Sequence, residues 1–171
     1  MNVRRIAVLA LFSAMAVAIH WAEGLLPPPL PVPGVKLGLA NAVTLLVMVT
    51  CSAFEAFLVL MVRILIGSLV FGQAIGFLYS IAGGIACFLI MLFLLRFLGG
   101  RYLPLVSLFG ALAHNAAQLI TAVLLTGTPG VFAYAPLLVL SGTVTGLFIG
   151  LIAHFALPFL KATLHNDNIK N

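Results

Sequence analysis

Long apolar runs follow one another along almost the whole chain, and they restrict its possible folds more than any other feature. Hydrophobic residues make up 64% of the 171 residues, whereas charged residues make up only 6%. A soluble domain of this length needs much more polar surface, because its outer face is solvated. The runs are long enough to cross a bilayer as helices, and they lack the alternation of a membrane β-barrel. The sequence therefore predicts an all-α integral membrane protein.

We expect residues 1–171 to form a single transmembrane domain with six helices. The N-terminal run resembles a signal peptide, but no convincing cleavage site follows it, so we interpret it as a retained first helix. The loop after it carries five prolines and should be stiff and non-helical. The second helix is shorter than the ~20 residues of a straight span, which favours a tilted or partly re-entrant helix. The predicted helices cover residues 6–22, 37–50, 53–71, 74–97, 104–126 and 136–158.

The lysines and arginines are distributed unevenly between the two sides of such a bundle. Six spans place both termini on one side, and that side then holds six basic residues, whereas the other holds only Lys36. By the positive-inside rule both termini are cytoplasmic, in the cytoplasmic (inner) membrane of a bacterium. The positive charge then reports topology and contact with anionic membrane lipid, and no nucleic acid partner is expected. The six residues are Arg4, Arg5, Arg96, Arg101, Lys161 and Lys170.

Arg63 lies near the middle of the third predicted helix. An arginine at that depth costs about 2.5–3.5 kcal/mol on insertion scales, so it should face the bundle interior and have a partner. Glu55 is two turns away on the same helix, so we do not expect these two side chains to meet. Arg63 is then either an internal staple or part of a binding site.

Further polar residues gather on the second and fifth predicted helices. His114 and Gln118 are four residues apart and share a face, with Asn115 beside them, and Asn41 lies on the second helix. These side chains form either a hydrogen-bond network between helices or the lining of a polar cavity. We favour a cavity, because so many polar groups gather on few helices. The candidate substrate-binding residues are Lys36, Asn41, Arg63, His114, Asn115 and Gln118.

Small residues recur at every fourth position on three of the predicted helices. Glycine stripes on the fourth and sixth helices are expected to pack inside the bundle, because small residues let two helices approach closely in lipid. On the first helix, Ala10, Ala14 and Ala18 form a similar stripe. A first helix at the bundle edge could present this stripe to another protein, so these alanines are candidate partner-docking residues.

The sequence lacks the motifs of an independent enzyme. No phosphate-binding loop of the G-x-x-x-x-G-K-[ST] type is present. The only acids are Glu23, Glu55 and Asp167, which cannot form the paired aspartate-rich motifs that hold magnesium in prenyl diphosphate chemistry. Cys51 and Cys87 match no metal-binding spacing and are interpreted as small apolar residues. We therefore expect no catalytic activity, no cofactor and no metal site.

Four segments carry a resemblance to one family. They are Pro-Gly-Val-Lys-Leu-Gly-Leu-Ala-Asn at residues 33–41, Arg-Ile-Leu-Ile-Gly at 63–67, Ala-His-Asn-Ala-Ala-Gln at 113–118 and Leu-Ser-Gly-Thr-Val-Thr-Gly at 140–146. With these segments the chain resembles a bacterial membrane family labelled heptaprenyl diphosphate synthase component I, or Gx transporter. That family in turn resembles the substrate-binding S components of energy-coupling-factor (ECF) transporters.

This resemblance implies two alternative functions. S components are six-helix proteins that capture small molecules and borrow a coupling subunit and ATPases, which an alanine-rich first helix commonly contacts. On that basis the chain is interpreted as an S-component-like protein for uptake of an unidentified, vitamin-like or precursor-like small molecule. The alternative is a non-catalytic membrane subunit associated with heptaprenyl diphosphate or isoprenoid-quinone synthesis, or with membrane redox machinery.

Overall fold

A computed structural model describes residues 3–25, 38–71 and 74–166 of the chain. Within these ranges the chain forms six α-helices and two short 3-10 turns, and no strand. The turns are η1 (Gly99–Tyr102) and η2 (Pro129–Tyr134). The helices are α1 (Val3–Leu25), α2 (Asn41–Thr50), α3 (Ala53–Phe71), α4 (Ala74–Leu98), α5 (Leu103–Thr126) and α6 (Ala135–Asn166).

The six helices fall where the hydrophobic pattern predicts them, with differences at their ends. The second helix was predicted from residue 37, but α2 begins at Asn41, because Gly38 has a φ of +81° and starts a turn instead. The sixth was predicted to end at residue 158, but α6 continues to Asn166 with Pro158 inside it. Membrane helices tolerate an internal proline where neighbours re-satisfy the freed backbone groups. The proline-rich loop falls outside the described residues.

Most of this helical structure is long and apolar enough to lie in a membrane. Four stretches meet that criterion by length and composition: Val3–Leu25, Ala53–Val70, Ala74–Thr126 and Pro129–Ala162. The third of these contains both α4 and α5, whereas α2 has only ten residues. Exposed large apolar side chains also occur on all the long helices, as expected of a surface that faces lipid. The chain is thus an all-helical, multi-pass membrane protein, and crossing by all six helices stays a prediction.

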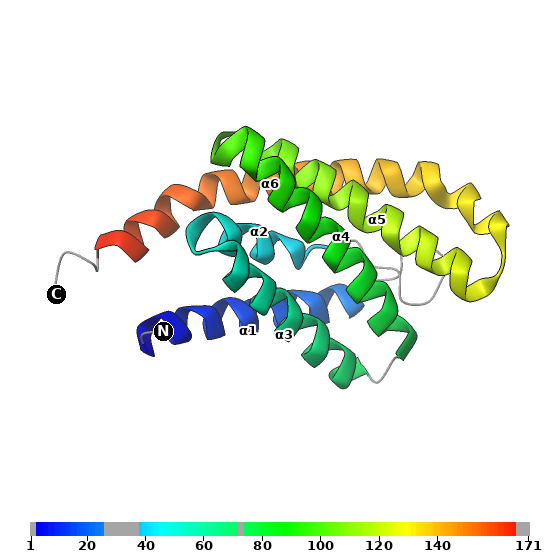
Figure 1. Cartoon of the computed structure of the whole chain (residues 1–171), viewed down its shortest axis with the longest axis horizontal. Coiled ribbons are helices and arrows are strands. Elements are labelled where there is room, and N and C mark those ends of the chain that lie inside the picture. The colour runs from blue at the N-terminus through cyan, green and yellow to red at the C-terminus, as the bar shows by residue number, and fades with distance from the viewer. Residues whose placement is uncertain (1–2, 26–37, 72–73, 167–171) are drawn as a thin grey trace.

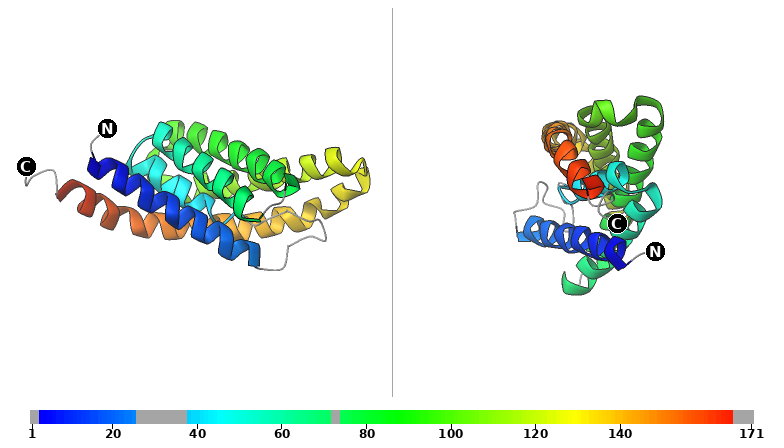
Figure 2. Two further views of the ribbon diagram at one scale, coloured as in Figure 1. Left: turned by 90° about the horizontal axis from the view of Figure 1, so that it is seen from below. Right: turned by 90° about the vertical axis from the view of Figure 1, so that its left-hand side faces the viewer.

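The short helix α2 lies at the centre of the bundle. It contacts all five other helices, and seven of its ten residues are buried. Figure 1 and Figure 2 show α4, α5 and α6 packed side by side, α1 and α3 on the other side, and α2 between the two groups. The start of α1, the end of α4, the start of α5 and the end of α6 lie at one end of the bundle (Figure 1).

The glycines of α6 set its close packing on α5. A Cβ added at Gly146 would lie 2.8 Å from the Cα of Leu108, and one at Gly150 would lie 2.4 Å from the Cα of Pro104. Only glycine allows the two backbones to approach so closely. The prediction that this glycine stripe packs inside the bundle is therefore confirmed.

Candidate functional site

Three buried polar side chains from α2, α3 and α5 meet at the centre of the bundle. The Nη1 atom of Arg63 donates a hydrogen bond to Oδ1 of Asn41 over 3.1 Å. The Nδ2 atom of Asn41 lies 3.1 Å from Nδ1 of His114. The exposed fractions are only 2%, 6% and 3% for Arg63, Asn41 and His114. We call these three residues the central cluster.

The hydrogen bonds of the central cluster run in one direction. A guanidinium has only donors, so Arg63 requires the oxygen of the Asn41 amide, and the amide nitrogen then points to His114. That nitrogen donates to Nδ1 of the neutral ring, which leaves the ring proton on Nε2. Neither Nε2 of His114 nor Nε of Arg63 has a hydrogen-bond partner within the part of the chain that the structure describes. The central cluster therefore contains two buried donors without an acceptor among the described residues.

Glycines surround the central cluster and leave room for its large side chains. A Cβ at Gly83 would lie 2.7 Å from Cε1 of His114, and one at Gly38 would lie 3.2 Å from Nε2 of the same ring. At Gly84, a Cβ would lie 3.2 Å from the Nη2 atom of Arg63. The imidazole is thus held between α4 and the turn that precedes α2.

Glu23, near the end of α1, binds the start of α2. Its Oε1 atom accepts hydrogen bonds from the backbone amides of Gly38 and of Leu39, the latter over 3.4 Å. A carboxylate in this position is stabilised by the partial positive charge of a helix N-terminus. Glu23 is buried and lies within electrostatic range of the Arg63 guanidinium. The charge of Arg63 is therefore partly balanced from α1.

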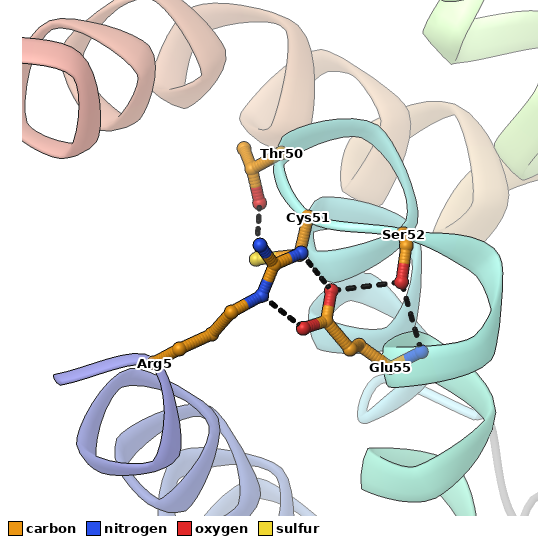
Figure 3. Close-up of polar contacts among 5 residues, drawn as sticks. All are labelled: Arg5, Thr50, Cys51, Ser52 and Glu55. Carbon is orange, nitrogen blue, oxygen red and sulfur yellow. Dashed lines mark hydrogen bonds and ion pairs between the residues drawn. The ribbon is translucent and has the colours of Figure 1, made fainter. Parts of the chain in front are cut away.

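A second polar network joins the start of α1 to the start of α3 (Figure 3). Arg5 donates from Nε to Oε1 of Glu55 and from Nη2 to Oε2, the latter over 2.8 Å. Ser52 donates to Oε2 of Glu55 over 2.7 Å and accepts from the backbone amide of Glu55 over 3.2 Å. The serine caps α3 while the glutamate three residues later returns to it, which resembles a capping box. We call Arg5, Ser52 and Glu55 the α1–α3 clamp.

An apolar groove of about 760 Å³ runs along α1 and α3. Ala10, Ala14 and Ala18 line it from α1, and Leu58 and Val62 line it from α3. The three alanines are exposed on the outside of the bundle, whereas Ala16 is completely buried. The alanine stripe is therefore a surface feature, and its use by a partner stays a prediction.

The model of one protein family matches residues 12–157, which is most of the chain. The chain belongs to the heptaprenyl diphosphate synthase component I family. No curated protein and no solved structure gave a match. The family is named for one component of a synthase, and the chain is accordingly a non-catalytic component and not the enzyme by itself. The further resemblance to ECF S components stays a prediction.

The structure brings together some of the predicted site residues and separates others. Asn41 faces His114, which confirms that the second and fifth helices are neighbours at this point. Gln118 is buried one turn further along α5, where its Cγ atom would lie 3.1 Å from a Cβ at Gly83. Asn115 points elsewhere and donates to the carbonyl of Leu138 in α6 over 2.8 Å. Lys36 falls outside the described residues.

Two features were missed by sequence reasoning. The Ser52-Ala53-Phe54-Glu55 pattern before an apolar run is a capping-box signature and could have revealed the α1–α3 clamp. Glu23 could have been noticed as an acid at the end of an apolar helix, close in sequence to a glycine turn. Among the residues that the structure describes, no three His, Cys, Asp or Glu side chains form a group able to hold a metal ion.

Proposed function

We propose that this member of the heptaprenyl diphosphate synthase component I family is a non-catalytic membrane component of isoprenoid diphosphate synthesis that works with a separate catalytic subunit. The family match over residues 12–157 carries this proposal. The scarcity of acidic residues supports it, because three acids in the chain cannot supply the paired magnesium-binding motifs of the reaction.

In this function the protein keeps a lipidic substrate or product at the membrane. An isoprenoid chain is apolar and partitions into the bilayer, whereas its diphosphate head is charged. The groove between α1 and α3 extends from Ile6 to Trp21, and 15 helical steps rise about 22 Å. Such a length of apolar wall suits an extended chain.

Affinity purification from native membranes tests this function. The tagged chain, extracted in mild detergent, should retain a soluble prenyl diphosphate synthase subunit that mass spectrometry identifies. Deletion of the gene should lower the content of long-chain isoprenoid quinones in the membrane. Retention of an ATPase and a coupling subunit, with quinone content unchanged, would overturn the proposal.

The exposed alanine stripe favours a second candidate function. S components of ECF transporters present small residues of their first helix to a coupling subunit, and Ala10, Ala14 and Ala18 are exposed on α1. In this alternative the chain captures a small molecule for import with separate ATPases. Loss of uptake of a retained small molecule after gene deletion would support it against the synthase component.

We further propose six membrane crossings with both termini in the cytoplasm of a bacterium. The support is the distribution of basic residues, because the start of α1, with Arg4 and Arg5, shares one end of the bundle with the end of α4, which holds Arg96, and with η1, which holds Arg101. A reporter fused after the last residue should be active only in its cytoplasmic form. Activity outside the cytoplasm would reverse the topology.

A further inference from the structure

We propose that the central cluster is a binding site for the anionic head of a ligand, of phosphate or diphosphate chemistry, with Arg63 and His114 as its donors. The head could belong to a prenyl lipid or to a small free anion. The diphosphate chemistry rests on the proposed function, whereas the site itself rests on the geometry of the three side chains.

Within the described residues, the central cluster has two donors without an acceptor. Nε of Arg63 and Nε2 of His114 have no partner among the described residues, and both side chains are at least 97% buried. A buried donor without a partner costs about 1–3 kcal/mol, and more when it is charged. The direction of the hydrogen-bond chain gives both atoms hydrogens to donate, so the missing group is an acceptor. Anionic oxygens are the acceptors that form the strongest bonds to such donors.

The positively charged Arg63 meets a neutral acceptor. Among the residues that the structure describes, its Nη1 donates to the amide oxygen of Asn41. Glu23 lies within electrostatic range, but its carboxylate does not bond to Nε of Arg63 or to Nε2 of His114, since these two atoms have no partner in the part of the chain that the structure describes. An additional anion beside Arg63 would therefore bond to donors that Glu23 leaves unused.

The start of α2 lies inside the bundle. Asn41 is the first residue of this helix and is buried, and its side chain contacts Arg63 and His114. Glu23 accepts from the backbone amides of Gly38 and Leu39 in the turn that precedes α2. The start of α2 and the two side-chain donors therefore lie in one region of the bundle.

Gly38 lies beside the His114 ring and has no side chain. A Cβ in its place would lie 2.8 Å from Nδ2 of Asn41 and 3.2 Å from Nε2 of His114. A side chain at this position would therefore crowd both the Asn41 amide and Nε2 of His114.

Binding to the purified full chain in nanodiscs tests the site without any partner protein. The probes are farnesyl diphosphate, inorganic pyrophosphate and the neutral alcohol farnesol, measured by calorimetry. We expect farnesyl diphosphate to bind at least about tenfold more tightly than farnesol, because only the diphosphate can accept from both donors. Pyrophosphate that binds as tightly as farnesyl diphosphate would identify a free anion as the ligand, and weak pyrophosphate binding would identify a lipid-borne head.

Two substitutions of His114 separate the ligand contact from the structural one. His114→Asn keeps an acceptor for Asn41 and removes the outer donor, whereas His114→Gln reaches further and keeps a donor near the Nε2 position. We expect Asn to weaken farnesyl diphosphate binding about tenfold and Gln to restore most of it. Arg101→Gln is the control, because it removes an exposed cation outside the central cluster.

The result can also be observed without a variant. In protein with ¹⁵N-labelled histidine, farnesyl diphosphate should shift the Nε2 resonance of His114 and leave that of exposed His154 unchanged. Equal binding of farnesol and farnesyl diphosphate, or equal weakening by Arg101→Gln and His114→Asn, would overturn the site. Since no partner is present in this experiment, its failure leaves the co-purification result of the proposed function intact.

Discussion

The central cluster and the α1–α3 clamp each contain one arginine, and the two arginines are bound very differently. In the clamp, Arg5 engages both oxygens of Glu55, and Ser52 completes the network. In the central cluster, among the residues that the structure describes, Arg63 donates to a neutral amide oxygen and its Nε has no partner. The clamp is closed by residues of the chain, whereas within the described residues the central cluster has donors without an acceptor.

The difference is informative because of where each arginine lies. The Arg5 side chain is 55% exposed, so any donor without a protein partner there can meet water. Arg63 is 2% exposed, and leaving a donor unpaired costs far more at that depth. The binding site proposed for the central cluster rests on this contrast: the exposed network is closed by protein groups, whereas the buried one has donors without a partner among the described residues.

The largest effect is expected from filling the space beside His114. Gly83→Leu would place a side chain where even a Cβ lies 2.7 Å from the imidazole, and the ring is held on its other side by Gly38. Overpacking of this kind typically costs about 1–3 kcal/mol, so the melting temperature in detergent should fall by several degrees. Gly100→Leu is the control, because nothing lies within 4 Å of a Cβ there. Equal melting temperatures for the two variants would contradict the close packing of the central cluster.

A somewhat smaller effect is expected from removing the charge of the central cluster. Arg63→Leu leaves Oδ1 of Asn41 without its donor, which should cost about 1–3 kcal/mol in the free energy of unfolding. Arg63→Lys keeps the charge but loses the planar fork, so it should recover only part of the stability. Denaturant titration of the three proteins measures the series. Full tolerance of Leu would mean that Arg63 does not face the bundle interior.

Most of the fold could be predicted because hydrophobic length and periodicity determine it. The third helix was predicted with the bounds that α3 has, since apolar residues fill it and breaks flank it. The start of α2 could not be predicted, because Gly38 turns the chain inside an apolar context where a helix was the simplest interpretation. The number of residues in α2 depends on that turn.

The sequence predicted which residues belong to the candidate site better than it predicted which of them are in contact. An arginine in the middle of a helix and a helix face with histidine and glutamine are easy to recognise in an apolar sequence. The structure does bring Asn41 into contact with His114. Asn115 points away from His114 and bonds to α6. This direction depends on how α5 is rotated about its axis, which the order of polar residues in the sequence does not reveal. The pairing of Glu55 with Arg5 joins residues that are 50 positions apart, so only the three-dimensional packing of α1 on α3 brings them together.

The α1–α3 clamp should respond more mildly than the central cluster. Ser52→Ala removes the cap of α3 and one bond to Glu55, which should cost about 1 kcal/mol. Ser68→Ala is the control, because that exposed serine bonds only to the carbonyl of Leu65 three residues earlier in α3. Chemical denaturation should rank Ser52→Ala as the more destabilised of the two. The opposite ranking would show that the clamp does not fix the start of α3.

The smallest effect on stability is expected in the groove that extends from the clamp along α1. Ala14 is exposed there, so Ala14→Leu should change the free energy of unfolding by less than about 0.5 kcal/mol. The leucine side chain would nevertheless fill part of the groove, because the residues that line it from α1 are small. Binding of the prenyl lipid proposed for this groove should therefore fall. Ala7→Leu makes the same change on an exposed position of α1 that does not line the groove. The amount of prenyl lipid retained by the purified protein, quantified by mass spectrometry, should drop for Ala14→Leu and persist for Ala7→Leu. A lower melting temperature for Ala14→Leu with the lipid still retained would mean that the stripe packs within the protein, and the contrast between a closed clamp and open binding regions would then be limited to the central cluster.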